Sequence, residues 1–523
     1  MKRNTLTTAV LAGLTGMAGM VSVSNAVNVN PDGLGQVLLY PYYTARGGND
    51  TLISIVNTTD DAKAVKVRFI EALNSREVLD FNLYLSPFDV WTAAVTADGD
   101  GAKMRTADTS CTVPYFQGGT PGDVGEQEFL DFQFATQTST DDRFDGGPTG
   151  LERTQSGYIE IIEMGTIAQG TASWDAIKHS NNVPPASGSA QVPCGLIVEQ
   201  WTPGSGAWSA DEFHDMREGE ARIPATGGLF GSASIVNVAE GTMFTYNATA
   251  IDGFWAGAAD HTDPGNLDPN LGGGTNAEAF VFNNGRLETL DYTGIDSIFA
   301  VNAVLGLETL MNEYTIEPEV GGRSEWVLTF PTKRFHTDAA PGGFLGATDD
   351  AIPPFTETWT RVDNVANPAC ETQNFDVWNR EEGEPIDEPD DIIVSPPPPE
   401  ADRPTFDLCR EANVIRFAND GSLPAYTEIF KEPSREDTFP DLGYVNFDLP
   451  EAFINGWVRF DFSGFVSEAD NNNLVVEGLP VIGFQASTTS FGAMPTGDGG
   501  TVLSNYGGLF SHRGSRSIVS ADD

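Results

Sequence analysis

Short runs in which apolar and polar side chains alternate are the feature that most restricts the fold of this chain. The pattern is clearest at residues 64–69 (AVKVRF) and 79–85 (LDFNLYL), and residues 51–56 form a similar run before the turn sequence NTTDD. Because successive side chains of a β-strand point to opposite faces, a period of two with one polar face predicts half-buried antiparallel strands. Further strands are expected at residues 157–163, 196–201, 232–238, 241–250, 325–330, 456–462 and 481–486.

The segments between these runs favour turns over helices. The chain has 56 Gly and 32 Pro, and the one helix expected among them is short, at residues 174–179. A parallel α/β sheet needs regularly spaced crossover helices, and the sequence offers none. We therefore predict a mainly β fold of antiparallel β-sandwich domains, immunoglobulin-like in type, with long acidic Gly/Pro-rich loops and few short helices.

The first 26 residues have the features of an export signal. Lys2 and Arg3 precede a weakly polar apolar stretch, and Ser24-Asn25-Ala26 has the small-x-small pattern of a cleavage site. A transmembrane anchor is disfavoured, because glycines interrupt a stretch shorter than the roughly 20 apolar residues that a spanning helix needs. The sequence thus predicts a secreted product without transmembrane insertion, Met1–Ala26 being removed.

The length of the remaining chain suggests two or three domains. We expect an N-terminal β-sandwich domain over residues 27–225, a second β-rich domain over residues 226–495 and a polar C-terminal tail over residues 496–523. Residues 381–403, inside the second domain, are rich in acid and proline. That composition predicts an exposed, extended insert.

The charge of the chain excludes one large class of function. The sequence has 28 basic and 75 acidic side chains and a formal net charge of -47. Nucleic-acid binding needs a basic surface, so no nucleic-acid partner is expected. Repulsion between so many carboxylates is relieved either by high salt or by divalent cations, and Ca²⁺ prefers oxygen ligands of this kind.

Four cysteines are present in a chain predicted to reach an oxidising compartment, which favours two disulfides. Three pairings are possible. We prefer Cys111 with Cys194 and Cys370 with Cys409, because each bond then closes a shorter loop within one expected domain. A zinc cluster is disfavoured, because no two cysteines have the close spacing of zinc ligands.

Two Asp-rich segments are candidate calcium sites. Asp98 and Asp100 lie in the sequence DGDG, and Asp141, Asp142 and Asp145 lie in DDRFDGG. Several carboxylates on a turn can converge on one ion. The alternative is a pair of solvated turns, because Asp and Gly are the residues that turns use most.

Motifs of known catalytic chemistry are missing from the sequence, which contains no G-x-S-x-G, H-E-x-x-H, Walker A or G-x-G-x-x-G pattern. Residues 261–263 and 336–338, both His-Thr-Asp, offer possible ligand pairs, although a His beside an Asp is commoner on a surface loop. Paired carboxylates for glycoside hydrolysis are not distinguishable among 75 acids. Aromatic side chains at residues 40–43 and at Trp174, Trp201, Trp208 and Trp255 either stack on sugars or pack in the core, and we favour the core.

Several segments resemble a group of secreted bacterial proteins, similar to a surface-layer protein family of marine gammaproteobacteria. The resemblance covers mainly the first fifth of the chain and one later segment, at residues 39–44, 54–59, 64–69, 74–78, 85–87, 89–91 and 331–335. It includes no catalytic motif, so no functional residue is transferred. The resemblance implies a two-dimensional protein lattice outside the outer membrane, shed into biofilm matrix.

These observations together predict a self-assembling extracellular structural protein at the cell surface, not an enzyme, with other copies of itself and an outer-membrane surface polysaccharide as partners. Calcium is the expected cofactor, joining acidic loops of neighbouring subunits. Two alternatives remain, a secreted carbohydrate-binding or adhesive module and an exported hydrolase.

Overall fold

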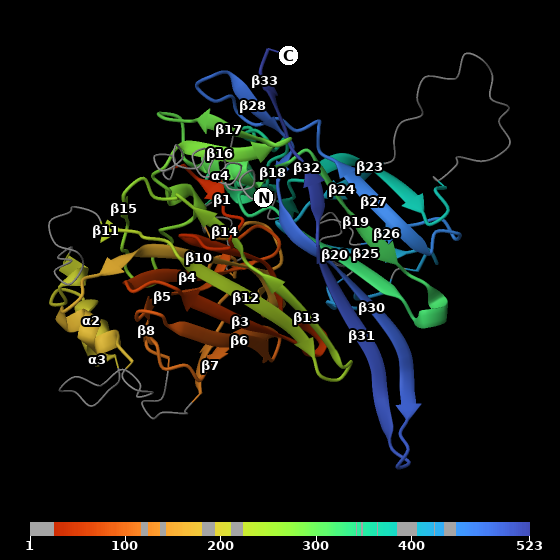
Figure 1. The fold of residues 1–523 in the computed structure, drawn as a ribbon, viewed down its shortest axis with the longest axis horizontal. Coiled ribbons are helices and arrows are strands. Elements are labelled where there is room, and N and C mark those ends of the chain that lie inside the picture. Colours follow the sequence, from red (N-terminus) through yellow and green to blue (C-terminus); the bar gives the residue numbers. More distant parts are fainter. Residues whose placement is uncertain are drawn as a thin grey trace, which may run out of the picture.

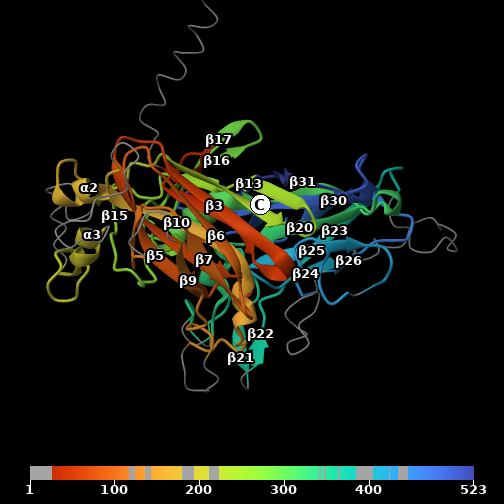
Figure 2. The same cartoon turned by 90° about the horizontal axis from the view of Figure 1, so that it is seen from below.

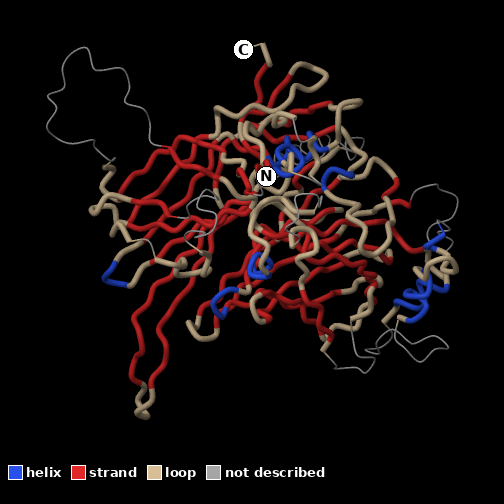
Figure 3. Tube along the Cα trace, turned by 180° about the vertical axis from the view of Figure 1, so that it is seen from behind, coloured by secondary structure: helices blue, strands red, loops and turns tan. Residues whose placement is uncertain are grey.

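The protein consists of two β-sandwiches that lie side by side (Figure 1). A computed structural model describes residues 26–116, 124–135, 143–179, 194–210, 223–340, 343–346, 349–362, 365–383, 405–422, 424–433 and 446–522. The predicted signal peptide, except Ala26, and the acidic insert, except residues 381–383, lie outside the described residues. Strands dominate the described residues (Figure 3), so the predicted mainly β, antiparallel sandwich architecture is confirmed.

The first sandwich pairs a seven-stranded sheet with a six-stranded sheet. In order across the seven-stranded sheet lie β1 (Asn28–Val29), β14 (Thr249–Asp252), β2 (Val37–Thr44), β10 (Ser156–Ile167), β4 (Ala62–Glu71), β5 (Glu77–Leu85) and β8 (Cys111–Val113). The six-stranded sheet has the order β13 (Thr242–Asn247), β12 (Leu229–Asn237), β3 (Asn49–Asn57), β6 (Val90–Asp98), β7 (Gly101–Thr106) and β9 (Gly125–Glu128).

The second sandwich pairs two five-stranded sheets. The sheet centred on β27, called here the β27 sheet, has the order β24 (Thr405–Leu408), β23 (Glu371–Asn379), β27 (Asn455–Asp461), β19 (Thr309–Thr315) and β32 (Arg513–Ser515). The other, the β20 sheet, has the order β26 (Asn446–Asp448), β25 (Ala412–Ala418), β20 (Arg323–Thr329), β30 (Ile482–Pro495) and β31 (Thr501–Ser511). Its β25–β26 pair is parallel, whereas β20 pairs antiparallel with both β25 and β30.

Short elements cover the edges of the two sandwiches. The helices are α2 (Ala172–Ile177), α3 (Gly195–Gln200), α4 (Ile298–Leu305) and α5 (Lys333–Thr337). Two-stranded pairs are formed by β11 (Ile223–Pro224) with β15 (Ala258–Ala259), β16 (Glu278–Asn283) with β17 (Arg286–Asp291), β18 (Gly306–Leu307) with β29 (Leu479–Pro480), β21 (Thr360–Val362) with β22 (Val365–Asn367), and β28 (Leu474–Glu477) with β33 (Ser517–Ser520). Among the described residues, every helix is too short or too polar to cross a lipid bilayer.

The division of the chain differs from the expected one. Strands β12, β13 and β14 follow residue 225, yet they complete the first sandwich by pairing with β3 and β2. The predicted polar tail contains β31, β32 and β33, and β31 and β32 belong to the second sandwich. Long-range strand pairing sets both boundaries, and a shift in local composition does not reveal it.

One sheet contributes to the cores of both sandwiches. On the β20 sheet, Val327, Val414 and Phe484 belong to the apolar core of the first sandwich. Their neighbours Trp326 and Ile415 point the other way and belong to the core of the second sandwich. Two views at right angles show the strands of the two sandwiches in contact along this sheet (Figures 1 and 2). The sandwiches therefore form one packed body.

The predicted polar face of the seven-stranded sheet is buried, contrary to the expectation of half-buried strands. All ten residues of β4 are buried. Lys63 reaches Glu163 at 2.8 Å, and Lys66 reaches Asp80 at 3.2 Å. Backbone carbonyls of the loop that follows β15 also accept hydrogen bonds from side chains of this face. For example, Lys66 donates to the carbonyl of Asp263. Burial is possible because each charge has an opposite charge and hydrogen-bond partners.

Both predicted disulfides are present. Cys111 in β8 is bonded to Cys194 at the start of α3, and Cys370 is bonded to Cys409. The second bond joins the chain just before β23 to the chain just after β24, two strands that pair antiparallel. It therefore ties together the two ends of the segment that contains the predicted acidic insert.

Candidate functional site

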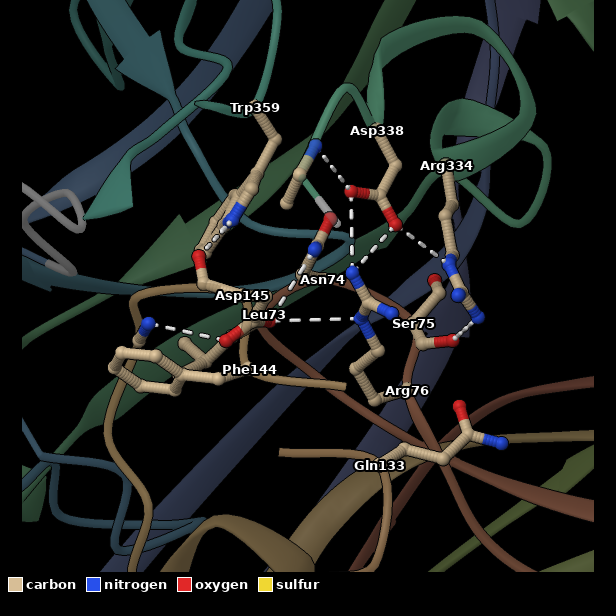
Figure 4. A network of polar contacts seen from close by, with 12 residues as sticks. Leu73, Asn74, Ser75, Arg76, Gln133, Phe144, Asp145, Arg334, Asp338 and Trp359 are labelled. Carbon is tan, nitrogen blue, oxygen red and sulfur yellow. Dashed lines mark hydrogen bonds and ion pairs between the residues drawn. The ribbon is translucent and has the colours of Figure 1, made fainter. Parts of the chain in front are cut away.

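A network of buried charges lies where the first sandwich meets the α5 segment (Figure 4). Arg76 follows the turn between β4 and β5, and it is buried between two carboxylates from distant parts of the chain. Its Nη2 lies 2.9 Å from Oδ2 of Asp338, which follows α5. Its Nε lies 3.6 Å from Oδ2 of Asp145, in the loop before β10. The guanidinium of Arg76 thus reaches a carboxylate that lies 262 positions away along the chain.

Arg334, on α5, adds a second link between the same segments. Its Nε lies 2.9 Å from Oδ2 of Asp338, one helical turn away. Its Nη1 donates to the backbone oxygen of Ser75 at 2.8 Å. Ser75 has a φ of 51°, in the left-handed region that side chains rarely adopt. The hydrogen bond from Arg334 helps to hold that turn in place.

Arg153 completes the network on the side of the first sandwich. Its Nη2 lies 2.6 Å from Oδ2 of Asp145, and its Nε lies 2.9 Å from Oε2 of Glu71. Asp145 also accepts from the side chain of Asn74 and the backbone of Gly147. Burial alone would raise the pKa of Asp145, but the two arginines and these hydrogen bonds hold it well below the ordinary value.

The turn at residues 72–76 is shaped by Glu71. Its carboxylate accepts from the backbone N–H groups of Leu73, Asn74 and Arg76 at 2.7 to 3.0 Å. These bonds satisfy buried backbone donors that no strand pairs with. Residues 74–78 and 331–335 therefore meet at this network.

A second buried acid and base lie at the edge of the network. Lys333 donates from Nζ to the backbone oxygens of Ala369 at 2.6 Å and Leu408 at 3.2 Å, on either side of a disulfide. Burial raises the pKa of Glu411 to about 8, while the charge of Lys333 opposes that rise. Burial likewise raises the pKa of Glu325 to about 7, although two backbone N–H groups donate to its carboxylate.

A cavity of about 530 Å³ opens beside the network. Arg76 and Arg334 line its inner side, and the rest of the lining is mainly apolar, including Phe116 and Phe132. The guanidinium carbon of Arg143 lies 4.4 Å from the centre of the Phe132 ring. The carboxylates of Glu77 and Asp80 also line the cavity, but its three arginines outnumber them. The cavity therefore fits a molecule with an apolar or ring-shaped body and an anionic group, because arginine recognises carboxylates and phosphates.

The network itself is suited to structure more than to proton transfer. Asp145 and Asp338 each contact two arginines, and burial of Asp145 is outweighed by its arginines, which hold its pKa well below the ordinary value. A general acid needs a proton near neutral pH and a path to a substrate. Among the buried acids, Glu325 and Glu411 have pKa values raised by burial to about 7 and about 8, and both are enclosed in the core.

The predicted calcium ligands do not form one site. Asp98 ends β6 and pairs with Lys103 at 3.2 Å, and Asp100 lies exposed in the following turn. Asp145 is buried, and its carboxylate pairs with Arg76 and Arg153. Asp141 and Asp142 lie outside the described residues. Within the described ranges, no group of three His, Cys, Asp or Glu side chains is arranged to hold a metal.

The other candidate residues are buried. His261 and His336 have pKa values lowered by burial to about 3 and about 4, so both are neutral. His261 contacts the hydroxyl of Tyr84, and His336 contacts the side chain of Asn302. The side chains of Tyr40, Tyr42 and Tyr43 and of Trp174, Trp201, Trp208 and Trp255 are all buried, as the preference for core packing predicted.

Sequence reasoning missed an exposed apolar hairpin. Strands β30 and β31 continue past the second sandwich as a projecting hairpin, residues 489–506, called here the hairpin arm (Figures 1 and 3). Asp498 is the one charged side chain in its sequence. Exposed apolar side chains lie along it, namely Phe491, Met494, Val502, Leu503 and Tyr506. Their lack of charge in so acidic a chain is the signal that sequence reading could have used.

Comparisons with models of protein families, with curated proteins and with solved structures found no match for this chain. Its function is therefore inferred from the chemistry and the arrangement of its own residues.

Proposed function

We propose that the protein is a secreted structural protein that assembles with copies of itself into a lattice at the cell surface, outside the outer membrane and in biofilm matrix, without catalytic activity. The hairpin arm is the observation that carries this proposal. Val502 and Tyr506 are 53% and 63% exposed. Exposed apolar patches of this kind mark surfaces where proteins interact.

The energetics favour association through the hairpin arm. Full burial of a Val, Leu, Met or Phe side chain contributes about 1.5–3 kcal/mol. The rest of the molecule is rigid, because the two sandwiches share core residues and are joined by buried ion pairs. A rigid subunit loses little additional entropy when it enters a lattice.

The net charge of the subunits makes their assembly depend on salt and divalent cations. Subunits with a formal charge of -47 repel each other, and the repulsion weakens as salt or divalent cations are added. We propose that Ca²⁺ joins acidic loops of neighbouring subunits, with Asp98 and Asp100 as candidate ligands. Such a site between subunits needs carboxylates from both copies, so it forms only on assembly.

Negative-stain electron microscopy of the mature protein tests the proposal, with millimolar CaCl₂, with a chelator and with high NaCl. We expect ordered sheets with calcium and their loss with the chelator at low salt. The variant Met494→Asp places a charge on the hairpin arm and should abolish the sheets. Its matched control, Leu287→Asp, alters an exposed apolar residue of β17 on the opposite side of the molecule in Figure 1 and should leave them intact. Monodisperse particles under every condition contradict the proposal.

The cavity favours a second candidate function, a secreted binding module. An acidic sugar of an outer-membrane surface polysaccharide has the ring and the carboxylate that the lining fits. Calorimetric titration with glucuronate oligosaccharides, compared with neutral oligosaccharides, tests this function. Binding that Phe132→Ala weakens at least tenfold would support it, and equal or absent binding of both ligands would exclude it.

A further inference from the structure

We propose that the hairpin arm of one copy packs on the open face of the six-stranded sheet of a second copy. The inference rests on the proposed self-assembly and names the two surfaces that meet. The receiving surface is called here the sheet groove, a hollow of about 440 Å³ across β12, β3, β6 and β7. Its lining includes Leu52, Ser54, Thr92, Ala94 and Ser232.

The charges of the sheet groove lie towards one end of its strands. Outward-facing positions of β13, β12, β3 and β6 carry two ionisable side chains among the described residues, Asp50 and Asp98, and those of β7 carry Lys103 and Arg105. The other outward-facing residues are Leu52, Ser54, Val56, Val90, Thr92, Ala94, Thr96, Phe230, Ser232, Ser234, Val236, Met243, Thr245 and Asn247. Arg105 lies at one end of the groove and is paired with Glu126.

The low charge of the hairpin arm and of the sheet groove favours their association. Two copies of a chain with a formal charge of -47 are repelled wherever acidic surfaces approach each other. The hairpin arm has one charged side chain, Asp498. On the sheet groove, Asp98 pairs with Lys103 and Arg105 pairs with Glu126, so the two surfaces meet with little repulsion. The arm supplies large apolar side chains, and the groove supplies small residues that leave room for them, such as Ser54 and Ala94.

The dimensions of the two surfaces also match. Five residues of an extended strand, such as 491–495, span about 17 Å, and the axes of four adjacent strands span about 14 Å. A hairpin arm laid across the sheet therefore covers the groove from β12 to β7.

The hairpin arm is positioned to reach another copy and not its own sheet. Near its base, Asn505 donates to the backbone oxygen of Glu240 in the turn after β12, at 2.6 Å. Leu503 lies against Gly241 in the same turn. These contacts fix the base, and the tip projects beyond the body of its own chain (Figure 1).

Because the arm and the groove are different surfaces, the contact is head-to-tail. Such contacts propagate in a row unless the rotation between copies closes a ring. The arm thus supplies one of the two directions of contact that a planar lattice needs.

Disulfide trapping between two variants tests the contact. The four native cysteines are all in disulfides, so an introduced cysteine supplies the one free thiol. Val502→Cys on the arm, carrying an affinity tag, is mixed with untagged Ser54→Cys in the groove under assembly conditions and mild oxidation. Thr289→Cys, on exposed β17, is the matched control for the groove variant.

We expect the arm–groove heterodimer on a non-reducing gel, at least tenfold above the arm–control heterodimer. Dominant arm–arm homodimers, or no excess over the control, overturn the inference. Electron microscopy of the same samples separates it from the proposed function. Ordered sheets without arm–groove disulfides overturn this inference but not the proposed lattice. Arm–groove disulfides without ordered sheets overturn the proposed lattice but not this inference. If neither sheets nor arm–groove disulfides form, the inference and the lattice are both overturned.

Discussion

At the scale of single residues, the molecule buries far more charge than its composition suggests. Arg68 contacts Glu77 and Glu160, and Arg153 contacts Asp145 and Glu71, all of them buried. Ion pairs of this kind contribute modestly compared with apolar packing, but removing one partner is costly because the other charge is left buried. Each buried ion pair therefore favours folds in which its two segments are in contact.

Glu411 is the residue whose protonation should be most visible in stability. Its pKa is raised from 4.5 to about 8 by burial, so the folded protein keeps a proton that the unfolded chain releases above pH 4.5. The stabilising effect of that proton is full below about pH 4.5 and is lost as pH rises through about 8. Glu411→Gln cannot ionise, so at pH 8 it should exceed the wild type in free energy of unfolding by on the order of 2 kcal/mol.

Urea unfolding of Glu411→Gln and the wild type at pH 5.5 and pH 8 measures this difference. Glu313→Gln, at an exposed position of β19, is the control and should follow the wild type at both values. A difference between Glu411→Gln and the wild type that does not change with pH would contradict the prediction.

At the scale of elements, most strands were predictable and their neighbours were not. The strand predicted at residues 196–201 was wrong, because that segment forms helix α3. The alternation at residues 64–69 correctly gave β4, and the spacing of the cysteines correctly gave both disulfides. The same alternation wrongly placed Lys66 and Arg68 at the surface, because a period of two identifies a polar face but not what covers it. The pairing of β12 with β3 joins segments about 180 residues apart, which local pattern does not encode.

The candidate site could be predicted only in part, because its residues come from distant segments of the chain. Asp145 stood out in an Asp-rich segment, but its arginine partners were not identifiable from sequence, since Arg76 is 69 residues away and Arg153 belongs to another element. In the sequence, an aspartate beside glycines fits both a calcium-binding loop and a buried ion pair. Only long-range packing distinguishes them, and here it places two guanidiniums against the carboxylate.

The Cys370–Cys409 bond should stabilise the β23–β24 pair through the loop that it closes. The bond spans 39 residues, and the entropy of closing such a loop corresponds to about 4 kcal/mol. The double variant Cys370→Ser/Cys409→Ser should therefore unfold at lower guanidinium concentration, with a loss approaching that value. A loss below about 1 kcal/mol in equilibrium unfolding would show that the β23–β24 pair already restrains the loop in the unfolded chain.

At the scale of the whole molecule, the two sandwiches depend on each other. Tyr246 stacks on Phe484 at 4.9 Å, and Tyr42 packs on the edge of Phe430 at 5.3 Å, each pair joining the two sandwiches. The hydroxyl of Thr329 also donates to the backbone oxygen of Pro41. Separation of the sandwiches would expose these rings and leave buried polar groups without partners.

A fragment of residues 27–305, which contains every strand of the first sandwich, should therefore fail to form a native core on its own. We expect the fragment to lack near-ultraviolet circular dichroism and to bind ANS. The mature full-length chain should show near-ultraviolet dichroism and should not bind ANS. The control is the mature full-length chain produced and refolded in the same way. A fragment with full-length-like aromatic dichroism and cooperative unfolding would show that the first sandwich is autonomous.

The β20 sheet, whose two faces serve two cores, also has a mechanical consequence. Force applied at the tip of the hairpin arm enters β30 and β31, passes into β20 and β25, and reaches the first sandwich through interlocked side chains with no hinge between them. A sheet of such subunits under tension would stretch and tear at the contacts between molecules before any subunit yields.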